Sequence, residues 1–383
     1  MKATFLQEDM AKGLSVVSRI IGQKTTLPIL LNVLVQAKED RIKLVSTNME
    51  LTISVMFPAE VEREGETTIP AKILNDLIST MPNPKVMFDL DVIRQNITLY
   101  SGTSVNDIKC VDSVEFPKEP SIGDEGTSVI VPLQEFRTLV KKSSVSAYTD
   151  EQPKILSGDL LRFSENCLTI GSVDGMRASE GRMKIENSND FSFIVPAKNI
   201  LEFSKIAPDN EEIVSIHLPA GENRIIFKTK NLQFTSGLLN GNFPEYWNIF
   251  PKSSVCKIKV SSLSFLKAIK QAEVFARESS NVMRIENKKD LLLDELKISS
   301  KSKERGANNA TIPSETTSSG IDSIPVSFAV DFVREIMEVV ENPNVSIELN
   351  SSNEPIVIRE DGNDNYIWLM MPRNPKIDDE YKG

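Results

Sequence analysis

The sequence predicts an α+β protein built from three similar domains, each with an antiparallel sheet that carries helices on one face. The main observation is a repeat with a period of about 127 residues. A segment made of an apolar residue, a proline and a small or apolar residue occurs at Ile69–Ala71, Val195–Ala197 and Ile324–Val326. The chain has 383 residues, 40% of them hydrophobic, which is enough to give each repeat a core of its own.

Each repeat opens with a segment whose apolar residues recur at helical spacing. In the first repeat, Met10, Leu14, Val17 and Ile21 form one apolar stripe of an amphipathic helix. The corresponding stripes of the later repeats are Phe136, Leu139 and Val140, and then Phe265, Ala268, Ile269 and Ala272. Short strands are expected after this helix, in the first repeat at 42–45 and 51–55.

A second helix is expected to begin at each repeated proline, because proline suits a first helical position, where its missing N–H costs no hydrogen bond. A strand with one buried face follows each of these helices. Its alternating apolar residues are Val86, Phe88 and Leu90, then Val214, Ile216 and Leu218, and finally Val345, Ile347 and Leu349. We therefore expect domains at 1–124, 125–253 and 254–383, the last with a short C-terminal tail at 374–383.

The composition excludes several classes of protein. With 54 acidic and 44 basic residues the net charge is −10, so the chain is not expected to coat nucleic acid with its whole surface. Cys110, Cys167 and Cys256 are isolated, which argues against disulfides and zinc clusters and fits a reducing cytoplasm. No apolar run approaches the ~20 residues of a membrane helix. A cytoplasmic protein without a cofactor, a metal or a membrane segment is expected.

An enzyme is also disfavoured. His217 is the only histidine, and it lies in the alternating strand at 214–218, where a role as an ordinary sheet residue is the better interpretation. The sequence contains no phosphate-binding loop, no dinucleotide fingerprint and no HExxH zinc motif. Any reaction served by this protein is expected to belong to a partner.

Charge is distributed unevenly over the predicted helices. In each repeat the first helix, at 8–24, 134–142 and 263–277, holds more Lys and Arg than Asp and Glu. If the helices share one face of an assembly, that face is positive and the rest strongly negative. Such a protein could surround a polyanion and attract its phosphates without reading sequence. The alternative is that these side chains only solvate the exposed sides of amphipathic helices.

Several short segments, taken in order with the triplication, resemble the bacterial DNA polymerase III beta subunit family, the sliding clamps. The resemblance covers essentially the whole chain. The segments are Thr26–Leu30 with Asn32, Ser46–Leu51, Thr68–Lys72, Val173–Arg177, Gly241–Tyr246 and Met371–Arg373.

This resemblance implies a non-catalytic processivity factor that encircles duplex DNA and tethers the replicative polymerase. It implies a head-to-tail homodimer, closed into a ring with helices lining the hole and sheets outside. In such dimers an edge strand of the first domain pairs with the third domain of the partner. Here that implies the strand at 103–109, with Ile108, against Val274, Phe275 and the strand from Lys297 onward.

The resemblance also implies two kinds of binding site. One is an apolar pocket for short linear peptides of the polymerase, the clamp loader and repair proteins. Its residues here would be Leu156, Val173, Gly175, Met176, Arg177, Ala178, Pro244, Asn248, Ile249, Leu369, Met371, Pro372 and Arg373. The other is the DNA-facing surface, with phosphate contacts from Lys24, Lys72, Arg137, Lys141, Lys142, Thr149, Lys154 and Lys198. Without the resemblance, Asp174–Gly175 would be interpreted as an ordinary turn.

The chain departs from the family pattern at some of these positions. Met176 stands where histidine is common and Ala178 replaces a larger residue, so the pocket is expected to be wider or differently selective. Lys301, Lys303 and Arg305 replace acidic interface residues, so cross-dimerisation with another clamp is expected to be disfavoured. The polar tail at 374–383 extends beyond the family's usual end. Two alternatives stay open: a clamp-like scaffold that binds peptides without encircling DNA, and a clamp encoded by a mobile element for its own polymerase.

Overall fold

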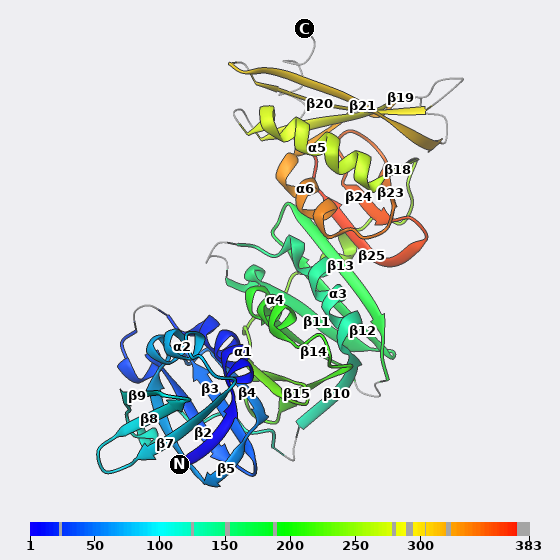
Figure 1. Cartoon of the computed structure of the whole chain (residues 1–383). Coiled ribbons are helices and arrows are strands. Elements are labelled where there is room, and N and C mark those ends of the chain that lie inside the picture. The colour runs from blue at the N-terminus through cyan, green and yellow to red at the C-terminus, as the bar shows by residue number, and fades with distance from the viewer. Residues whose placement is uncertain are drawn as a thin grey trace. The chain divides into compact units, whose positions relative to one another are not determined.

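The computed structural model describes residues 1–22, 25–123, 126–149, 154–186, 190–277, 281–288, 294–302, 304–318 and 323–373. The chain forms two compact units, the first from 1–134 and 202–238, the second from 135–201 and 239–383 (Figure 1). The strands of the described residues pair antiparallel, and helices lie against the sheets, which confirms the predicted α+β class.

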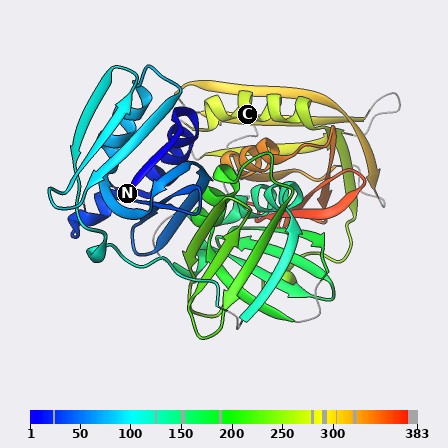
Figure 2. The same cartoon turned by 60° about the horizontal axis from the view of Figure 1, so that its bottom comes forward.

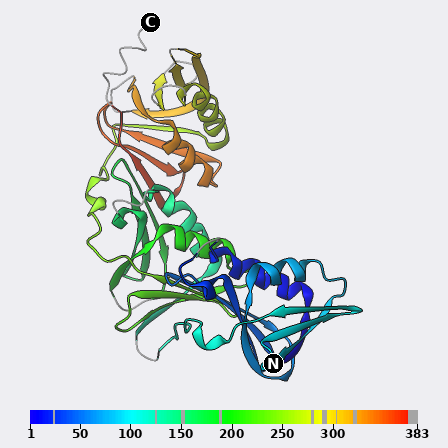
Figure 3. The same cartoon turned by 90° about the vertical axis from the view of Figure 1, so that its left-hand side faces the viewer.

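The first unit contains two sheets. One has the strand order β5-β1-β7-β8-β9, formed by β5 (Glu60–Arg63), β1 (Lys2–Leu6), β7 (Lys85–Asp91), β8 (Asn96–Ser101) and β9 (Ser104–Lys109). The other has the order β10-β15-β16-β17-β4-β3-β2-β6, formed by β10 (Gly126–Pro132), β15 (Ile213–Pro219), β16 (Arg224–Lys228), β17 (Leu232–Gly237), β4 (Leu51–Pro58), β3 (Arg41–Thr47), β2 (Asn32–Lys38) and β6 (Gly65–Pro70). Helices α1 (Gln7–Val17) and α2 (Ala71–Ser79) pack side by side on these strands (Figure 3).

The second unit is built on one twelve-stranded sheet with the order β14-β11-β12-β13-β25-β24-β23-β18-β21-β20-β19-β22. Its strands are β14 (Phe191–Pro196), β11 (Gly158–Ser164), β12 (Cys167–Val173), β13 (Arg177–Lys184), β25 (Asn363–Met370), β24 (Ile356–Glu360), β23 (Asn344–Leu349), β18 (Cys256–Ser261), β21 (Gly306–Ser318), β20 (Asp294–Ser302), β19 (Val282–Lys288) and β22 (Val326–Ala329). Its helices are α3 (Leu133–Ser143), α5 (Ser262–Ala276) and α6 (Val330–Val339), with α4 (Ala197–Ile206) shared between the units. Figure 2 shows α5 lying along the long strand β21.

The apolar stripes predicted for the helices form the cores. Met10, Leu14 and Val17 of α1 are fully buried, and the helix ends there, so that Ile20 of the following 3-10 turn completes the stripe in place of Ile21. The alternating strands are confirmed as β7, β15 and β23, whose inward side chains are buried except Leu218, which is half-buried.

The prediction for the second helix of the third repeat was wrong. Pro70 and Pro196 each end a strand and directly precede a helix, as N-terminal neighbours of α2 and α4. Pro325, however, precedes strand β22, and α6 begins only at Val330. The reason is that residues 326–329 pair with β19, so the strand continues beyond the proline before the chain can turn into a helix.

Both units contain a junction in which the last strand of one repeat pairs with the fourth strand of the preceding repeat. In the first unit β17 pairs with β4, and in the second unit β25 pairs with β13. The two registers match, since Thr52 and Ala178 are each the second residue of their strand and face Thr235 and Leu369. Sheets therefore continue from repeat to repeat, which explains why the second repeat is divided between the two units.

A buried ion pair joins the second and third repeats within the second unit. Lys142 Nζ lies 2.7 Å from a carboxylate oxygen of Glu360, and the two side chains are 4% and 2% exposed. The ammonium group also lies over the ring of Tyr366, 4.5 Å from its centroid. Burial raises the pKa of Glu360, but the bonds from Lys142 and from backbone amides outweigh it and lower that pKa overall.

Removing one member of this pair should destabilise the second unit strongly, because the other charge is left buried without a partner. Lys142→Met is expected to lower the free energy of unfolding by about 3–5 kcal/mol. The double variant Lys142→Met/Glu360→Leu should recover most of that loss, as measured by urea unfolding. A double variant as unstable as the single one would contradict this account.

Asp159 of β11 should make stability depend on pH near neutrality. Its side chain is fully buried, Ser144 donates to Oδ2 at 2.5 Å, and Oδ1 has no hydrogen-bond partner among the described residues. Burial raises its pKa from 3.8 to about 7, and the Ser144 bond offsets this only in part. Its contribution to stability is therefore complete below the unfolded pKa and is lost as the pH rises through the folded pKa.

Asp159→Asn is accordingly expected to raise the free energy of unfolding relative to the unchanged protein at pH 8, and to lose this advantage as the pH falls toward 4. Urea unfolding at both pH values measures the difference, with the exposed Asp76→Asn as control. An advantage of equal size at pH 4 and pH 8 would exclude Asp159 as the titrating group.

Candidate functional site

An apolar cluster lies on the face of the second unit's sheet opposite its helices. We call it the pocket cluster. Its buried members are Leu160, Val173, Ala178, Ile194, Tyr246, Val357, Ile367 and Leu369, and its partly buried members are Ile155, Leu156, Leu239, Phe243, Phe250 and Met371. They come from β11, β12, β13, β14, β24, β25 and the segments at 154–157 and 239–250. The cluster therefore joins the second repeat to the third within one unit.

At the junction of β13 with β25, a row of neighbouring side chains that crosses the strands is apolar. The equivalent row at the junction of β4 with β17 in the first unit is polar. Val173, Ala178 and Leu369 are neighbours on β12, β13 and β25. The equivalent row of the first unit is formed by three threonines, Thr47, Thr52 and Thr235, each less than a tenth exposed. Side-chain chemistry thus distinguishes two junctions that have the same strand pairing.

A tight turn at 174–176 forms one edge of the cluster. The Asp174 carboxylate accepts hydrogen bonds from the amides of Met176 and Arg177, each at 2.8 Å, and Gly175 has a positive φ of 91°. Met176 is 41% exposed, and its carbonyl accepts a bond from the amide of Met371. The turn therefore ties the end of β25 to the hairpin of β12 and β13.

The Arg177 side chain is buried and is not exposed at the surface of this site. Its guanidinium group donates to Asp174 at 2.8 Å and to Glu335 of α6 at 2.6 Å, and it lies 4.4 Å from the centre of the Phe332 ring. Its contribution is to fix the turn against the third repeat.

The segment at 243–250 forms the opposite edge. The Tyr246 hydroxyl donates to Glu180 at 2.6 Å, and its ring lies directly over Gly171, where any Cβ would collide with it. Burial, together with the charge of Glu180, raises the pKa of Tyr246, so the hydroxyl remains a donor. Trp247 and Ile249 of the following 3-10 turn are 37% and 47% exposed.

The structure brings five of the thirteen residues predicted for the pocket into one apolar cluster. Leu156, Val173, Ala178, Leu369 and Met371 belong to the pocket cluster. Of the other predicted residues, Gly175 and Met176 lie in the turn and Arg177 begins β13. Pro244, Asn248 and Ile249 lie in the 243–250 segment, and Pro372 and Arg373 follow the end of β25.

Sequence reasoning missed several members of the cluster. Leu160, Ile194 and Ile367 are apolar positions of alternating strands, a signal that was available but does not say which face of the sheet they share. Tyr246 was part of the quoted Gly241–Tyr246 segment, but only its bond to Glu180 reveals its place in the site.

Most of the predicted DNA-facing residues lie at the surface of their own units. Lys72 on α2, Lys141 on α3 and Lys198 on α4 are exposed, as are Thr149 and Lys154. Lys141 forms an ion pair of 3.0 Å with Glu341. These side chains are available for contact with phosphate groups.

The prediction for Lys142 was wrong, because its side chain is buried against Glu360 and Tyr366 and cannot reach solvent. Arg137 is half-buried and has polar or ring contacts of its own. Lys24 lies outside the described residues.

The predicted dimer residues need two corrections. Ile108 is only 5% exposed and packs inward from β9, beside Ile97 of β8, so it does not face a partner. The strand that contains Lys297, β20, lies between β19 and β21 and is paired on both sides at residues 295–299. Val274 is 64% exposed and Phe275 is half-buried at the end of α5. Of the interface cations, Lys301 lies on the same interior strand, Arg305 is exposed in the following turn, and Lys303 is not among the described residues.

Other kinds of site lack support in the described residues. They contain no group of three or more His, Cys, Asp or Glu side chains arranged to hold a metal ion. The helices in the described ranges are all too short or too polar to cross a membrane. His217 of β15 pairs with Ser128 and Ile226, and burial, with the charge of Lys228, lowers its pKa.

Comparison with known proteins gives matches along nearly the whole chain. Models of the DNA polymerase III beta subunit match its N-terminal domain at residues 1–120, its central domain at 130–245 and its C-terminal domain at 247–374. The beta sliding clamp of Bacillus subtilis is 25% identical over 384 residues, covering 97% of this chain and 99% of the relative. The beta sliding clamp of Staphylococcus aureus is 25% identical over 382 residues, with the same coverage.

Solved structures share the fold. The DNA polymerase sliding clamp of B. subtilis superposes with a TM-score of 0.90 at 24% identity, over 98% of this chain and 99% of the other. The beta subunit of Streptococcus pyogenes DNA polymerase gives a TM-score of 0.91 at 20% identity, over 98% and 100%. The chain therefore belongs to the DNA polymerase III beta subunit family, the beta sliding clamps, which are non-catalytic subunits of that polymerase.

Proposed function

We propose that two copies of this chain close head to tail into a ring around duplex DNA, and that the pocket cluster tethers the polymerase, the clamp loader and other replication and repair proteins by short apolar peptides. The observation that carries the proposal is the repeated strand junction. A chain whose repeats join by one kind of strand pairing can close into a ring if its two unpaired ends are complementary.

Two strands of the required kinds are left without a junction partner. β9 is the last strand of the first repeat and lies at a sheet edge, paired only with β8. β21 is the fourth strand of the third repeat, and among the described residues its positions 306–313 pair on one side only, with β20. Pairing β9 with β21 of a partner would repeat the junctions β17–β4 and β25–β13. In the proposed dimer, β21 therefore takes the place predicted for the strand from Lys297 onward, β20.

Helix positions support the same closure. Arg19, Val145 and Val274 follow the apolar stripes of the first helices at corresponding places. Arg19 forms an ion pair with Glu202 of the next repeat, and Val145 packs against the core of the third repeat. Val274 is 64% exposed in the single chain. By this correspondence it contacts the first repeat of a partner.

Val274→Asp should therefore convert the dimer into monomers, because a carboxylate would be buried at the closing junction. The fold should survive, since the side chain is exposed in the single chain, and circular dichroism serves as that control. Sedimentation equilibrium gives the mass. A dimer of unchanged strength would exclude this position from the interface.

Encirclement is tested by retention on DNA. The clamp is loaded onto plasmid circles, half of which are then linearised. Retention on circles with loss from cut ends is expected for a topological link, whereas equal retention on both would leave only the scaffold alternative. This is the experiment that decides the proposed function.

Exposed helix lysines should set how long the ring stays on one stretch of DNA. Lys72→Glu/Lys198→Glu is expected to shorten residence on circles and to reduce the salt dependence of binding, because fewer phosphate counterions are released. Single-molecule residence times measure this. Lys228→Glu, on strand β16, is the matched control. Equal residence of all three proteins would contradict the lining assignment.

The pocket cluster should be the peptide site. Met371→Glu is expected to weaken binding of a labelled peptide with leucine and phenylalanine side chains by roughly 30-fold, the effect of a hot-spot residue of about 2 kcal/mol. Fluorescence anisotropy measures the affinity. Ile213→Glu, at an exposed position of β15, is the control. Retention on circular DNA should not change. An unaltered peptide affinity would remove the pocket assignment.

A further inference from the structure

A row with two arginines lies next to the pocket cluster, on the same face of the sheet. Arg162, Thr169 and Arg182 are cross-strand neighbours on β11, β12 and β13. They lie two residues along each strand from Leu160, Gly171 and Glu180, so they share the face that carries the pocket cluster. The two sites are therefore continuous on one surface.

Trp247 meets this row from the 243–250 segment. The guanidinium carbon of Arg162 lies over its indole ring, 5.1 Å from the ring centroid, and the Tyr246 ring packs edge-on against it at 5.5 Å. Because Tyr246 is anchored to Glu180, the indole is held in place although it is 37% exposed. An exposed tryptophan fixed beside a cation offers a flat apolar surface and a positive charge to a bound chain.

The two arginines differ in their partners. Arg182 donates to Glu180 through Nε at 2.9 Å and through a terminal nitrogen at 2.6 Å, so its charge is already balanced. No carboxylate of the described residues lies within ion-pair distance of Arg162, which is half-buried over the ring. Arg162 is thus the cation of this row that can accept an external partner.

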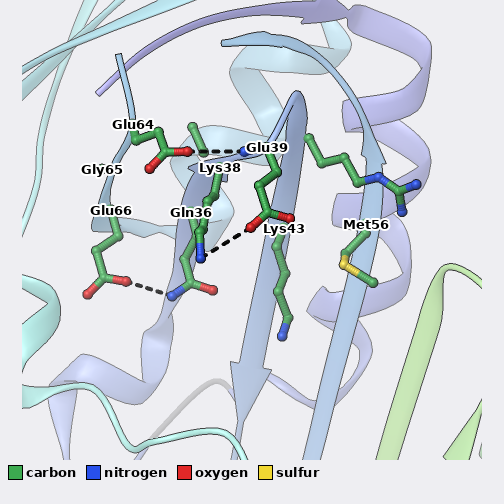
Figure 4. Close-up of a pocket in the computed structure, with 10 residues that line it drawn as sticks. Gln36, Lys38, Glu39, Lys43, Met56, Glu64, Gly65 and Glu66 are labelled. Carbon is green, nitrogen blue, oxygen red and sulfur yellow. Dashed lines mark hydrogen bonds and ion pairs between the residues drawn. The ribbon is translucent and has the colours of Figure 1, made fainter. Parts of the chain in front are cut away.

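The first unit shows how the equivalent row is satisfied from within. Gln36, Lys43 and Met56 hold there the strand positions of Arg162, Thr169 and Arg182. They line a pocket with a volume of about 610 Å³. In this pocket the side-chain amide of Gln36 donates a hydrogen bond to Glu66 (Figure 4). The carboxylate of Glu119 accepts bonds from Lys43 and from Ser54.

Glu119 and Tyr246 correspond to each other, since they follow Phe116-Pro117 and Phe243-Pro244 at the same distance. In the first unit the chain therefore places its own carboxylate over this face of the sheet. In the second unit tyrosine takes that place, and none of the described residues supplies a carboxylate to Arg162.

We propose that Arg162 and Trp247 form a subsite next to the pocket cluster, which binds an acidic residue flanking the apolar side chains of a docked peptide. This inference rests on the proposed peptide pocket and adds a charge preference to it. The aspartate or glutamate of the peptide pairs with the guanidinium group, while its neighbouring side chain covers the indole. Peptides with a neutral flank use the pocket cluster alone.

The test uses the full-length clamp and labelled peptides that share one apolar segment of leucine and phenylalanine. One pair carries three aspartates at either end, and the matched pair carries three asparagines. Arg162→Gln, which introduces the residue found at the equivalent position of the first unit, is expected to weaken binding of one aspartate peptide roughly two- to fivefold at low salt. Binding of the asparagine peptides should stay unchanged, and Lys228→Gln is the control.

The tryptophan gives a second measurement. The chain has two tryptophans, and Trp368 is fully buried, so a fluorescence change on adding the aspartate peptide is expected to come from Trp247. Trp247→Phe should abolish that change. Thermal unfolding of each variant verifies that it is folded.

The outcomes separate the two hypotheses. Equal affinities of aspartate and asparagine peptides for the unchanged protein, or an Arg162→Gln variant that weakens both equally, would overturn the subsite while leaving the pocket intact. Failure of every peptide to bind the unchanged protein would overturn the pocket itself. A charge-dependent loss confined to the aspartate peptide establishes the subsite.

Discussion

The structure depends on one interaction, the strand pairing by which the sheet of one repeat continues into the next repeat. An open edge presents unpaired N–H and C=O groups and invites further pairing. β17 closes the edge of β4, and β25 closes the edge of β13. This pairing merges sheets across repeats, and it leaves β9 and the first part of β21 as the remaining pair of matching edges. The proposed assembly with a second copy would use the same kind of strand pairing that joins the repeats within the chain.

The pocket cluster is a local variation on this common junction. Strand pairing alone cannot distinguish the two junctions, because their registers correspond residue by residue. Threonines fill the row at Thr52 and Thr235, whereas Ala178 and Leu369 stand at the same places in the second unit. Apolar contacts with Tyr246 and its neighbours then complete the cluster that we propose as the peptide site. The repeats thus share the strand pairing of the junction, and a few side chains distinguish the pocket cluster from the equivalent row of the first unit.

The overall charge of the protein does not describe the charge at individual helix surfaces. The protein is acidic as a whole, with a net charge of −10, yet lysines are exposed on α2, α3 and α4. Local cations can therefore attract phosphate while the total charge opposes unspecific coating. Neighbouring residues can differ completely, since Lys141 lies at the surface and Lys142 is buried in an ion pair with Glu360. Which role a lysine takes depends on the elements packed against it.

The sequence by itself determined the triplication, most of the helix–strand order and the family, together with five residues of the pocket cluster, because these are written in periodic patterns and short segments. Tertiary structure decided what depends on partners distant in the chain. Lys142 meets a carboxylate more than two hundred residues away. Ile108 turned inward on β9, and β21 rather than β20 kept the free edge. Arg162 and Trp247 became neighbours only when the 243–250 segment crossed the sheet. Local periodicity fixes which face of an element is buried, but strand pairing decides which side chains share that face.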